Sequence, residues 1–240
     1  MTAAAARIGL IGDVHAECER LEVALDHFDA RGVDTVLCTG DIVDGKGCVD
    51  RACRLLDERG VLCVAGNHER WILGNRVRHI PDAHALDALD EWARAFLAGL
   101  PRTQSLSTRA GRLLLCHGIG ENDQRKIFPG TERMPVERSE ELDAIIAHGR
   151  HRILVNGHLH YRMIVDFEGL TLINAGTLKR DNRSGFMELD LEADVVRFNG
   201  FDDALNVYEQ AVYPFAGHSR RVFRDTRCFD RDWTPFPLFD

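Results

Sequence analysis

The stretch IGDVH at residues 11–15 has four counterparts further along the chain: TGDIVD at 39–44, AGNHE at 65–69, LLCHG at 114–118 and VNGHLH at 155–160. In each case a short apolar run leads into glycine and polar residues, which is typical of a buried strand that leaves a core. The carboxyl ends of parallel strands in an open α/β sheet gather around one crevice. We therefore expect the polar side chains of all five stretches to form one site.

The first 65 residues alternate strand and helix patterns. Strands are expected at 7–12, 33–39 and 61–65, because each range is a short, mainly apolar run. Between them, apolar residues recur at helical spacing over 21–28 and 49–56. This βαβαβ order predicts parallel strands with right-handed crossovers.

The middle of the chain contains mainly helix and loop patterns. An apolar face over 89–97 predicts a helix that ends before Pro101, since proline disfavours helical geometry in the residue before it. A strand is expected at 112–116 and a further helix at 139–148. The stretch 119–138 has no clear period, and long loops of this kind are often functional.

The last third of the chain is richer in strand patterns. Short β-like runs, separated by glycine or charged residues, occur at 153–156, 163–167, 171–174, 185–191 and 195–198. These runs predict a second, mixed sheet that packs on the first.

The C-terminal stretch 201–240 is rich in aromatic residues and shows little periodicity. Nine of the 18 aromatic side chains lie there: Phe201, Tyr208, Tyr213, Phe215, Phe223, Phe229, Trp233, Phe236 and Phe239. We expect one domain over residues 1–200, with 201–240 as an extended tail that packs on the same domain. The alternative is that these aromatic side chains form a contact between copies in a homo-oligomer.

The composition fits one α/β domain, because 240 residues, 45% of them hydrophobic, can bury a full core. No apolar run approaches the roughly 18 residues of a membrane span, and residues 1–6 lack the features of a secretory signal. The seven cysteines include no C-x-x-C pair, which favours a reduced compartment. We therefore expect a cytoplasmic protein without a membrane partner.

The net charge argues against a nucleic-acid partner. The chain has a formal net charge of -8, whereas non-specific binding to phosphate backbones relies on clustered Lys and Arg. Bound metal cations would offset part of this acidity.

The candidate metal ligands are seven side chains at the ends of the expected strands: Asp13, His15, Asp41, Asn67, His117, His158 and His160. Carboxylate, imidazole and amide groups suit Mn, Fe, Zn or similar divalent ions better than metals that seek thiolates. Seven ligands exceed what one tetrahedral ion uses. Two ions that share a carboxylate would account for the surplus, and paired ions recur in enzymes that act at phosphorus.

Taken in order, the five stretches resemble the motifs of the calcineurin-like metallophosphoesterase family. That family has D-x-H, G-D-x-x-D, G-N-H-[ED], H-G and G-H-x-H, and all five elements stand here between residues 11 and 160. The resemblance implies an α/β fold with four layers, α/β/β/α, in which two mixed sheets are flanked by helices.

The resemblance also implies two metal sets. One consists of Asp13, His15, Asp41 and His160, and the other of Asp41, Asn67, His117 and His158, so that Asp41 bridges two divalent ions. Manganese is the first choice, with Fe, Zn, Ni or Co as alternatives. A hydroxide between the ions would attack a phosphomonoester or phosphodiester in line. The expected substrate is a small phosphoester, with nucleotides among the candidates.

His68 and Asp44 match the catalytic pair of the family. The resemblance implies that His68 protonates the leaving oxygen or stabilises charge, and that Asp44 fixes its ring. The alternative is a metal-binding scaffold of the same fold that docks protein partners without turnover. A third interpretation, a relative of nucleases, would need a basic groove and is disfavoured by the acidic charge.

The chain departs from the protein-phosphatase branch of the family after Asp44. That branch has an arginine that clamps phosphate, whereas Gly45 and Lys46 follow here, and lysine does not reproduce bidentate recognition. A phosphoprotein substrate is therefore disfavoured. The segment 174–177 matches a family segment expected to close the floor of the site.

Other polar residues near the motifs are expected to have ordinary roles. We assign structural or solvated roles to six further histidines: His27, His79, His84, His148, His151 and His218. Five cations flank the expected site loops, and solvation is favoured over contact with a substrate phosphate: Arg125, Lys126, Lys179, Arg180 and Arg183.

Overall fold

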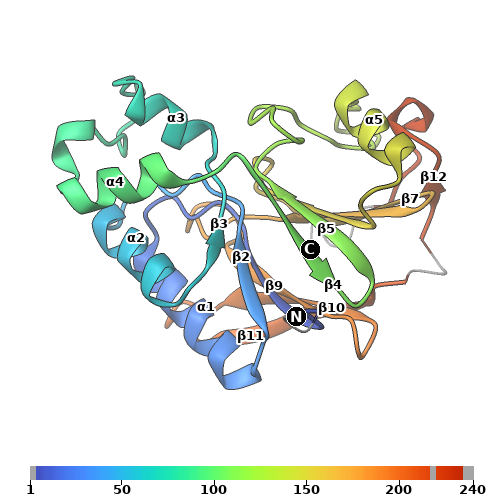
Figure 1. Cartoon of the computed structure of the whole chain (residues 1–240), viewed down its shortest axis with the longest axis horizontal. Helices are drawn as coiled ribbons and strands as arrows, with labels where there is room; N and C mark the ends of the chain where they lie inside the picture. Colours follow the sequence, from blue (N-terminus) through green and yellow to red (C-terminus); the bar gives the residue numbers. More distant parts are fainter. Residues whose placement is uncertain (1–3, 217–219, 235–240) are drawn as a thin grey trace.

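Two six-stranded sheets lie face to face, with helices on the outer side of each (Figure 1). The computed structural model describes residues 4–216 and 220–234. The strand order is β11-β10-β9-β1-β2-β3 in the first sheet and β12-β7-β8-β6-β5-β4 in the second. The four-layer α/β/β/α sandwich of two mixed sheets is thus confirmed.

The first sheet begins with the predicted βαβαβ unit. Its three strands are parallel: β1 (Arg7–Ile11), β2 (Thr35–Cys38) and β3 (Leu62–Cys63). Strand β3 is shorter than the expected range 61–65. At its end, the backbone N–H of Ala65 donates to the carbonyl of Pro101 and not to a residue of β2. The other half of the sheet is antiparallel: β9 (Gly185–Asp190), β10 (Val195–Phe201) and β11 (Val207–Pro214).

Three helices cover the outer face of the first sheet: α1 (Cys18–Arg31), α2 (Val49–Glu58) and α4 (Glu91–Gly99). Phe28, Leu56 and Leu97 lie on their apolar faces and are buried against the sheet. The first helix ends at Gly32, whose φ of 65° is a left-handed conformation that glycine adopts without strain. No helix in the described part of the chain is long and apolar enough to cross a membrane.

The second sheet has a parallel centre and antiparallel edges. Its parallel strands are β5 (Gly111–Cys116), β6 (Ile153–Asn156) and β8 (Leu170–Ala175). The flanking strands are β4 (Thr103–Thr108), β7 (Arg162–Phe167) and β12 (Val222–Phe223). Helix α5 (Glu140–His148) covers the outer face, and the Ser139 side chain caps it by accepting from the backbone of Leu142.

The layer between the two sheets is apolar. Ile8 and Leu10 of β1 belong to one cluster with Leu113, Leu115 and Ile173 of the second sheet, and all are fully buried. Removing each such side chain from water contributes about 1.5–3 kcal/mol. This layer therefore fixes the two sheets face to face and sets their strand ends side by side.

Two elements in the middle of the chain were not expected. Helix α3 (Asn67–Leu73) begins inside the AGNHE stretch and is too short to show a helical period. Strand β4 has the polar sequence TQSLST, in which Leu106 packs against the apolar layer. An antiparallel edge strand with one face in solvent needs few apolar residues, so its composition does not reveal it.

The interpretation of 201–240 as an extended tail is wrong for residues 207–214, which form β11 at the edge of the first sheet. The expected boundary at residue 200 falls inside β10. Beyond β11, Phe223 and Phe229 are buried against the second sheet. Phe236 and Phe239 lie outside the described residues, and the contact between copies stays a prediction.

Candidate metal centre

Each of the seven candidate ligands follows the end of a strand. Asp13 and His15 follow β1, Asp41 follows β2, Asn67 follows β3, His117 follows β5, and His158 and His160 follow β6. These five strands belong to both sheets. The carboxyl ends of the parallel strands in both sheets therefore contribute to one site. From the sequence we expected a crevice at the edge of one sheet.

The first cluster consists of Asp13, His15 and His160. His160 Nε2 lies 3.1 Å from Asp13 Oδ2 and 3.0 Å from His15 Nε2. One atom of each residue that is able to bind a metal lies within 4.8 Å of the others. Asp13 and His15 are buried, whereas the side chain of His160 is 24% exposed, so this cluster opens to solvent on one side.

The second cluster consists of Asp41, His117 and His158, which meet the same 4.8 Å limit. His117 Nε2 lies 3.3 Å from Asp41 Oδ2 and 3.1 Å from Asn67 Oδ1. Asp41 also forms a group with His15 and His68. Asp41 therefore stands between the two clusters.

Backbone carbonyls orient the rings of His15 and His117. His15 Nδ1 donates to the carbonyls of Val43 and Asp44 at 3.1 and 2.9 Å. His117 Nδ1 donates to the carbonyl of Thr39 at 2.8 Å. Because a carbonyl only accepts, each ring keeps a proton on Nδ1, and the neutral ring of His15 presents the lone pair of Nε2 to the site. Metal-binding histidines usually have this arrangement.

The electrostatics of the site favour a bound cation. Burial would raise the pKa of Asp41, but the imidazole of His117 and its neighbours hold that pKa below the ordinary value. Burial would lower the pKa of His117, but Asp41 and Asp13 raise it to about 10. Burial lowers the pKa of both His15 and His158 to about 4, so these two rings are neutral at pH 7. Ionised carboxylates beside the neutral rings of His15 and His158 suit a metal ion, and a metal held by His117 would displace the proton on its Nε2.

The backbone of the site is strained. Four candidate ligands have left-handed φ angles: His15 (46°), Asp41 (44°), His158 (69°) and His160 (61°). Such residues cost about 1–3 kcal/mol each and cluster at functional sites. Two glycines make room for the carboxylates, because a Cβ at Gly66 would lie 2.1 Å from Asp41 Oδ1 and a Cβ at Gly157 would lie 2.1 Å from Asp13 Oδ1.

His68 and Asp44 form a hydrogen-bonded pair beside the two clusters. His68 Nδ1 lies 2.7 Å from Asp44 Oδ2, and His68 Nε2 lies 3.6 Å from Asp41 Oδ2. Burial would lower the pKa of His68, but the three carboxylates Asp44, Asp41 and Glu69 raise it above the ordinary value. The ring is therefore held so that Nε2 faces the carboxylate of Asp41.

Two residues that hold this pair and its surroundings were not identified from the sequence. The carboxylate of Glu69 accepts from the backbone N–H groups of Gly66, Asp41, Ile42 and Val43 at 2.7–3.2 Å. His84, expected in a structural or solvated role, donates from its backbone N–H to Asp44 Oδ1 at 2.8 Å. Glu69 belongs to the AGNHE stretch, whereas no local signal marks His84.

The segment 174–177 lies directly against Asp13. The backbone N–H of Asp13 donates to the carbonyl of Gly176 at 3.1 Å, and Thr177 Oγ1 donates to the carbonyl of Asp13 at 2.7 Å. The Asn174 amide donates to Asn156 Oδ1 at 3.1 Å. The bonds of Gly176 and Thr177 support the loop after β1, and the bond of Asn174 joins this segment to the end of β6.

The donor atoms fit divalent metal ions. Carboxylate oxygens, imidazole nitrogens and an amide oxygen converge within two small clusters. Thr39 Oγ1 donates to Asp13 Oδ1 at 3.1 Å, which adds the second layer that oriented metal ligands usually have. The cysteines nearest in sequence are buried in the core, so thiolate ligands are absent from the described clusters.

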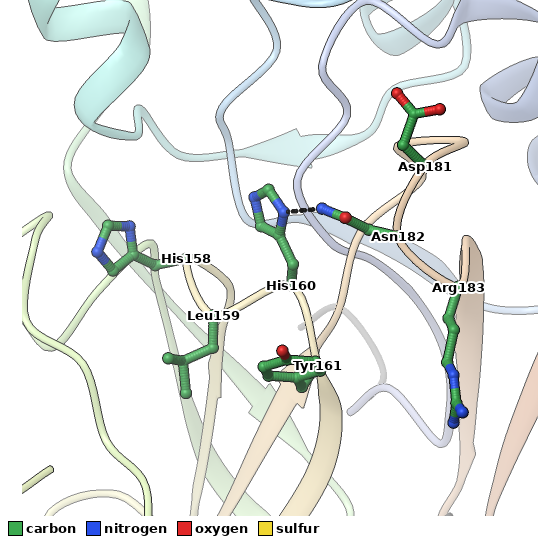
Figure 2. A pocket seen from close by; sticks show the side chains of 7 residues that line it. All are labelled: His158, Leu159, His160, Tyr161, Asp181, Asn182 and Arg183. Atoms are coloured by element: carbon green, nitrogen blue, oxygen red, sulfur yellow. Dashed lines mark hydrogen bonds between the residues drawn. The ribbon is translucent and has the colours of Figure 1, made fainter. Parts of the chain in front are cut away.

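A pocket opens beside the first cluster (Figure 2). It has a volume of about 400 Å³ and is lined by His158, Leu159, His160, Tyr161, Asp181, Asn182 and Arg183. Figure 2 shows the amide of Asn182 turned towards the ring of His160, and the two nitrogens Nδ2 and Nδ1 lie 2.8 Å apart. The pocket thus lies next to the candidate ligands and has both polar and apolar walls.

Several cations near the site have acidic partners. Lys46 Nζ lies 3.1 Å from Asp181 Oδ2. Arg180 binds the buried carboxylate of Glu17, with Arg180 Nη2 at 2.9 Å from Glu17 Oε2. Arg125 pairs with Glu141, whereas Arg183 lines the pocket, and His218 lies outside the described residues.

Comparison with known families identifies the superfamily to which this fold belongs. Residues 6–194 match the model of the calcineurin-like phosphoesterase superfamily domain. The chain belongs to this superfamily. A relative from Methanocaldococcus jannaschii, a protein named uncharacterized, is 23% identical over 191 residues, which are 75% of this chain and 73% of the relative.

Solved structures share the fold of this superfamily member at low sequence identity. A metallophosphoesterase from Sphaerobacter thermophilus has a TM-score of 0.60 and 21% identity, covering 82% of this chain and 88% of its own. YfcE, a phosphoesterase from E. coli, has a TM-score of 0.51 and 18% identity, covering 87% and 99%. A Vps29 variant from Entamoeba histolytica has a TM-score of 0.54 and 21% identity, covering 87% and 99%.

Proposed function

We propose that this calcineurin-like protein is a metal-dependent phosphoesterase that uses two divalent ions to hydrolyse a small phosphomonoester or phosphodiester. Asp13, His15, Asp41 and His160 would hold one ion. Asp41, Asn67, His117 and His158 would hold the other, with Asp41 shared. The two clusters and the position of Asp41 between them support this assignment.

The ions, when bound, would supply Lewis acidity toward a phosphoryl oxygen and toward the attacking water. Manganese is the preferred metal, with Fe, Zn, Ni or Co as alternatives, because the set of imidazole, carboxylate and amide ligands suits all of them. The chain's own contribution is to hold these donors in place. Their strained backbones and tied rings do this before any ion enters.

His68 is the proposed general acid. Asp44 accepts from Nδ1 at 2.7 Å and fixes the ring, so that Nε2 faces Asp41 and the space between the clusters. A proton at Nε2 would pass to the leaving oxygen of the ester. Asp44 acts as a positioning residue, because it touches His68 and not the reacting atoms.

The observation that most supports an enzyme is the contact between His68 and Asp44. Metal binding alone needs neither residue, whereas acid catalysis needs both a proton donor and a fixed ring. The pocket beside His160 offers room for the organic part of the substrate, with Tyr161 and Leu159 on its wall. A substrate of nucleotide size is therefore a reasonable target for assay.

A substrate panel tests this proposal. The protein is assayed with Mn²⁺ against a chromogenic phosphomonoester, a chromogenic phosphodiester, cyclic nucleotides and dinucleoside polyphosphates. Turnover that needs the metal and falls at least about a hundredfold in His68→Gln supports the proposal. Absence of turnover with every divalent ion would refute it.

The second candidate function is a metal-binding scaffold that docks protein partners. Vps29, a protein named for vacuolar protein sorting, shares the fold, and exposed apolar side chains such as Tyr208 and Val212 lie on the edge strand β11. The scaffold predicts tightly bound metal, measured by elemental analysis, without turnover of any ester. The intact contact between His68 and Asp44 favours the enzyme.

A further inference from the structure

Arg78 reaches the candidate centre from the segment between α3 and α4. Its Nη1 atom donates to His68 Nε2 at 3.2 Å. A guanidinium has five N–H donors, and this bond uses one of them. Among residues 4–216 and 220–234, no carboxylate lies within ion-pair distance of Arg78. Arg70, by contrast, donates from both Nε and Nη2 to the carboxylate of Asp123.

The ring of Trp71 holds this arginine beside His68. The Cζ atom of Arg78 lies 5.3 Å from the centroid of Trp71, and the rings of Trp71 and His68 lie 5.0 Å apart. Arginine commonly stacks on aromatic faces in this way. Half-burial of Arg78 agrees with a side chain that lies along the site and not out in solvent.

Hydrogen bonds at both ends fix the segment 76–84 across the site. At its start, the backbone N–H of Arg76 donates to the carbonyl of Trp71 at 2.8 Å. At its end, the backbone N–H of His84 donates to Asp44 Oδ1 at 2.8 Å, and that of Asp44 donates to His84 Nδ1 at 3.2 Å. Arg78 is therefore attached to both members of the catalytic pair, directly and through its own segment.

The loop after Asp44 supplies no such cation. Gly45 has no side chain, and Lys46 forms an ion pair with Asp181, with Lys46 Nζ at 3.1 Å from Asp181 Oδ2. The guanidinium that is absent from this loop is present at the site, but it comes from a segment more than 30 residues later in the chain.

We infer that Arg78 binds the phosphoryl group of the substrate and replaces the arginine that the loop after Asp44 lacks. The inference rests on the proposed phosphoesterase function. A planar guanidinium matches two phosphoryl oxygens through parallel N–H donors. When phosphate enters, Arg78 exchanges its one bond to His68 Nε2 for two bonds to charged oxygens. His68 Nε2, which no longer accepts from Arg78, can then take a proton from water and face the leaving group.

The test compares three variants in the full-length protein loaded with Mn²⁺. Arg78→Gln removes the charge, Arg78→Lys keeps the charge but loses the fork, and Arg76→Gln is the matched control. Arg76 lies in the same segment, with its guanidinium 5.4 Å from the Trp71 centroid, and it is exposed. The two readouts are binding of inorganic phosphate by calorimetry and hydrolysis of p-nitrophenyl phosphate.

Arg78→Gln should weaken phosphate binding and lower kcat/KM by roughly 10- to 100-fold, because hydrogen bonds to charged groups are among the stronger ones. Arg78→Lys should fall between this variant and the wild type, and Arg76→Gln should change either quantity by less than about threefold. In a fourth variant, Arg78→Ala, added guanidinium should restore part of the activity. If Arg78→Gln does not fold, the same two measurements on Arg78→Lys decide between the outcomes.

Unchanged phosphate affinity in Arg78→Gln would overturn the inference, even if kcat falls, because Arg78 would then act only by holding His68. Failure of the wild-type protein to bind phosphate would overturn it as well. Phosphate binding that depends on Arg78 in a protein without any turnover would support the inference and count against the proposed function. The two failures are thus distinguishable.

Discussion

Glu69 Oε2 accepts a hydrogen bond from the backbone N–H of Asp41 at 2.8 Å, and so ties the first turn of α3 to the loop after β2. The carboxylate is fully buried, and each of its oxygens accepts from two backbone N–H groups. The hydrogen bond to Glu69 thus holds Asp41 in its left-handed backbone conformation. The shape of the candidate bridging position therefore depends on a residue that would not touch a metal.

Replacing Glu69 with glutamine should destabilise the protein by about 2–4 kcal/mol, because one amide N–H₂ would face two backbone donors in a buried place. Glu58→Gln is the matched control, since Glu58 is exposed at the end of α2. Urea unfolding monitored by circular dichroism measures the free energy of unfolding of both variants. Equal stability of the two variants would show that the backbone bonds to Glu69 contribute little.

His68→Gln should lower kcat by about 10²- to 10⁴-fold while the bound metal content stays the same, because general acid catalysis is lost and the proposed ligands are not. Asp44→Asn should have a smaller effect on kcat, since Nδ1 can still donate to the amide oxygen. His148→Gln is the control, because His148 is exposed on α5 and donates to the carbonyl of Ala144 in its own helix. Loss of metal from His68→Gln would assign that residue to the ligand set.

Much of this site could be predicted from the sequence because its side chains follow directly on buried strands. Local signals place Asp13 after β1 and His117 after β5, and the order of the motifs brings in the remaining candidates. The same reasoning predicted both sheets. It did not predict that both sheets present their carboxyl ends to one site, since the sequence does not encode the relative position of two sheets locally.

The residues that could not be predicted depend on tertiary contacts. Arg78 and His84 lie in a segment without helix or strand periodicity, and only the fold brings them to His68 and Asp44. Edge strands pose a similar problem. β11 is half exposed and lies next to a bulge between Phe198 and Asn199, so its alternation is weak in the sequence.

Chelation of the metal should lower the melting temperature and abolish turnover, and Mn²⁺ should restore both. An ion present at 100 times its Kd stabilises the folded state by about 2.7 kcal/mol. Asp41→Asn should lose most of the metal and this stabilisation, because the proposed bridging charge is gone. Asp57→Asn, an exposed change in α2, is the control. Elemental analysis and thermal unfolding are the measurements, and full metal content in Asp41→Asn would contradict the bridging role.

Glu17 should make stability depend on pH below the neutral range. Burial would raise its pKa, but hydrogen bonds and charge from Arg180 and Arg20 hold the pKa below the ordinary value. The unfolded chain then binds a proton at a higher pH than the folded one. The stabilisation is therefore complete above about pH 5, beyond the usual glutamate pKa, and is lost as the pH falls through the lower folded value.

Glu17→Gln should remove this contribution, so the stability difference between wild type and variant should shrink as the pH falls from about 6 towards 3. Urea unfolding across that range measures this difference, with Glu19→Gln as the control because Glu19 is exposed two residues further on, in the first turn of α1. A difference that stays constant with pH would mean that Glu17 stabilises the fold through packing and not through its charge. The pair with Arg180 also joins the loop after β1 to the segment after β8 that lines the pocket, so the variant should bind substrate less tightly at pH 7.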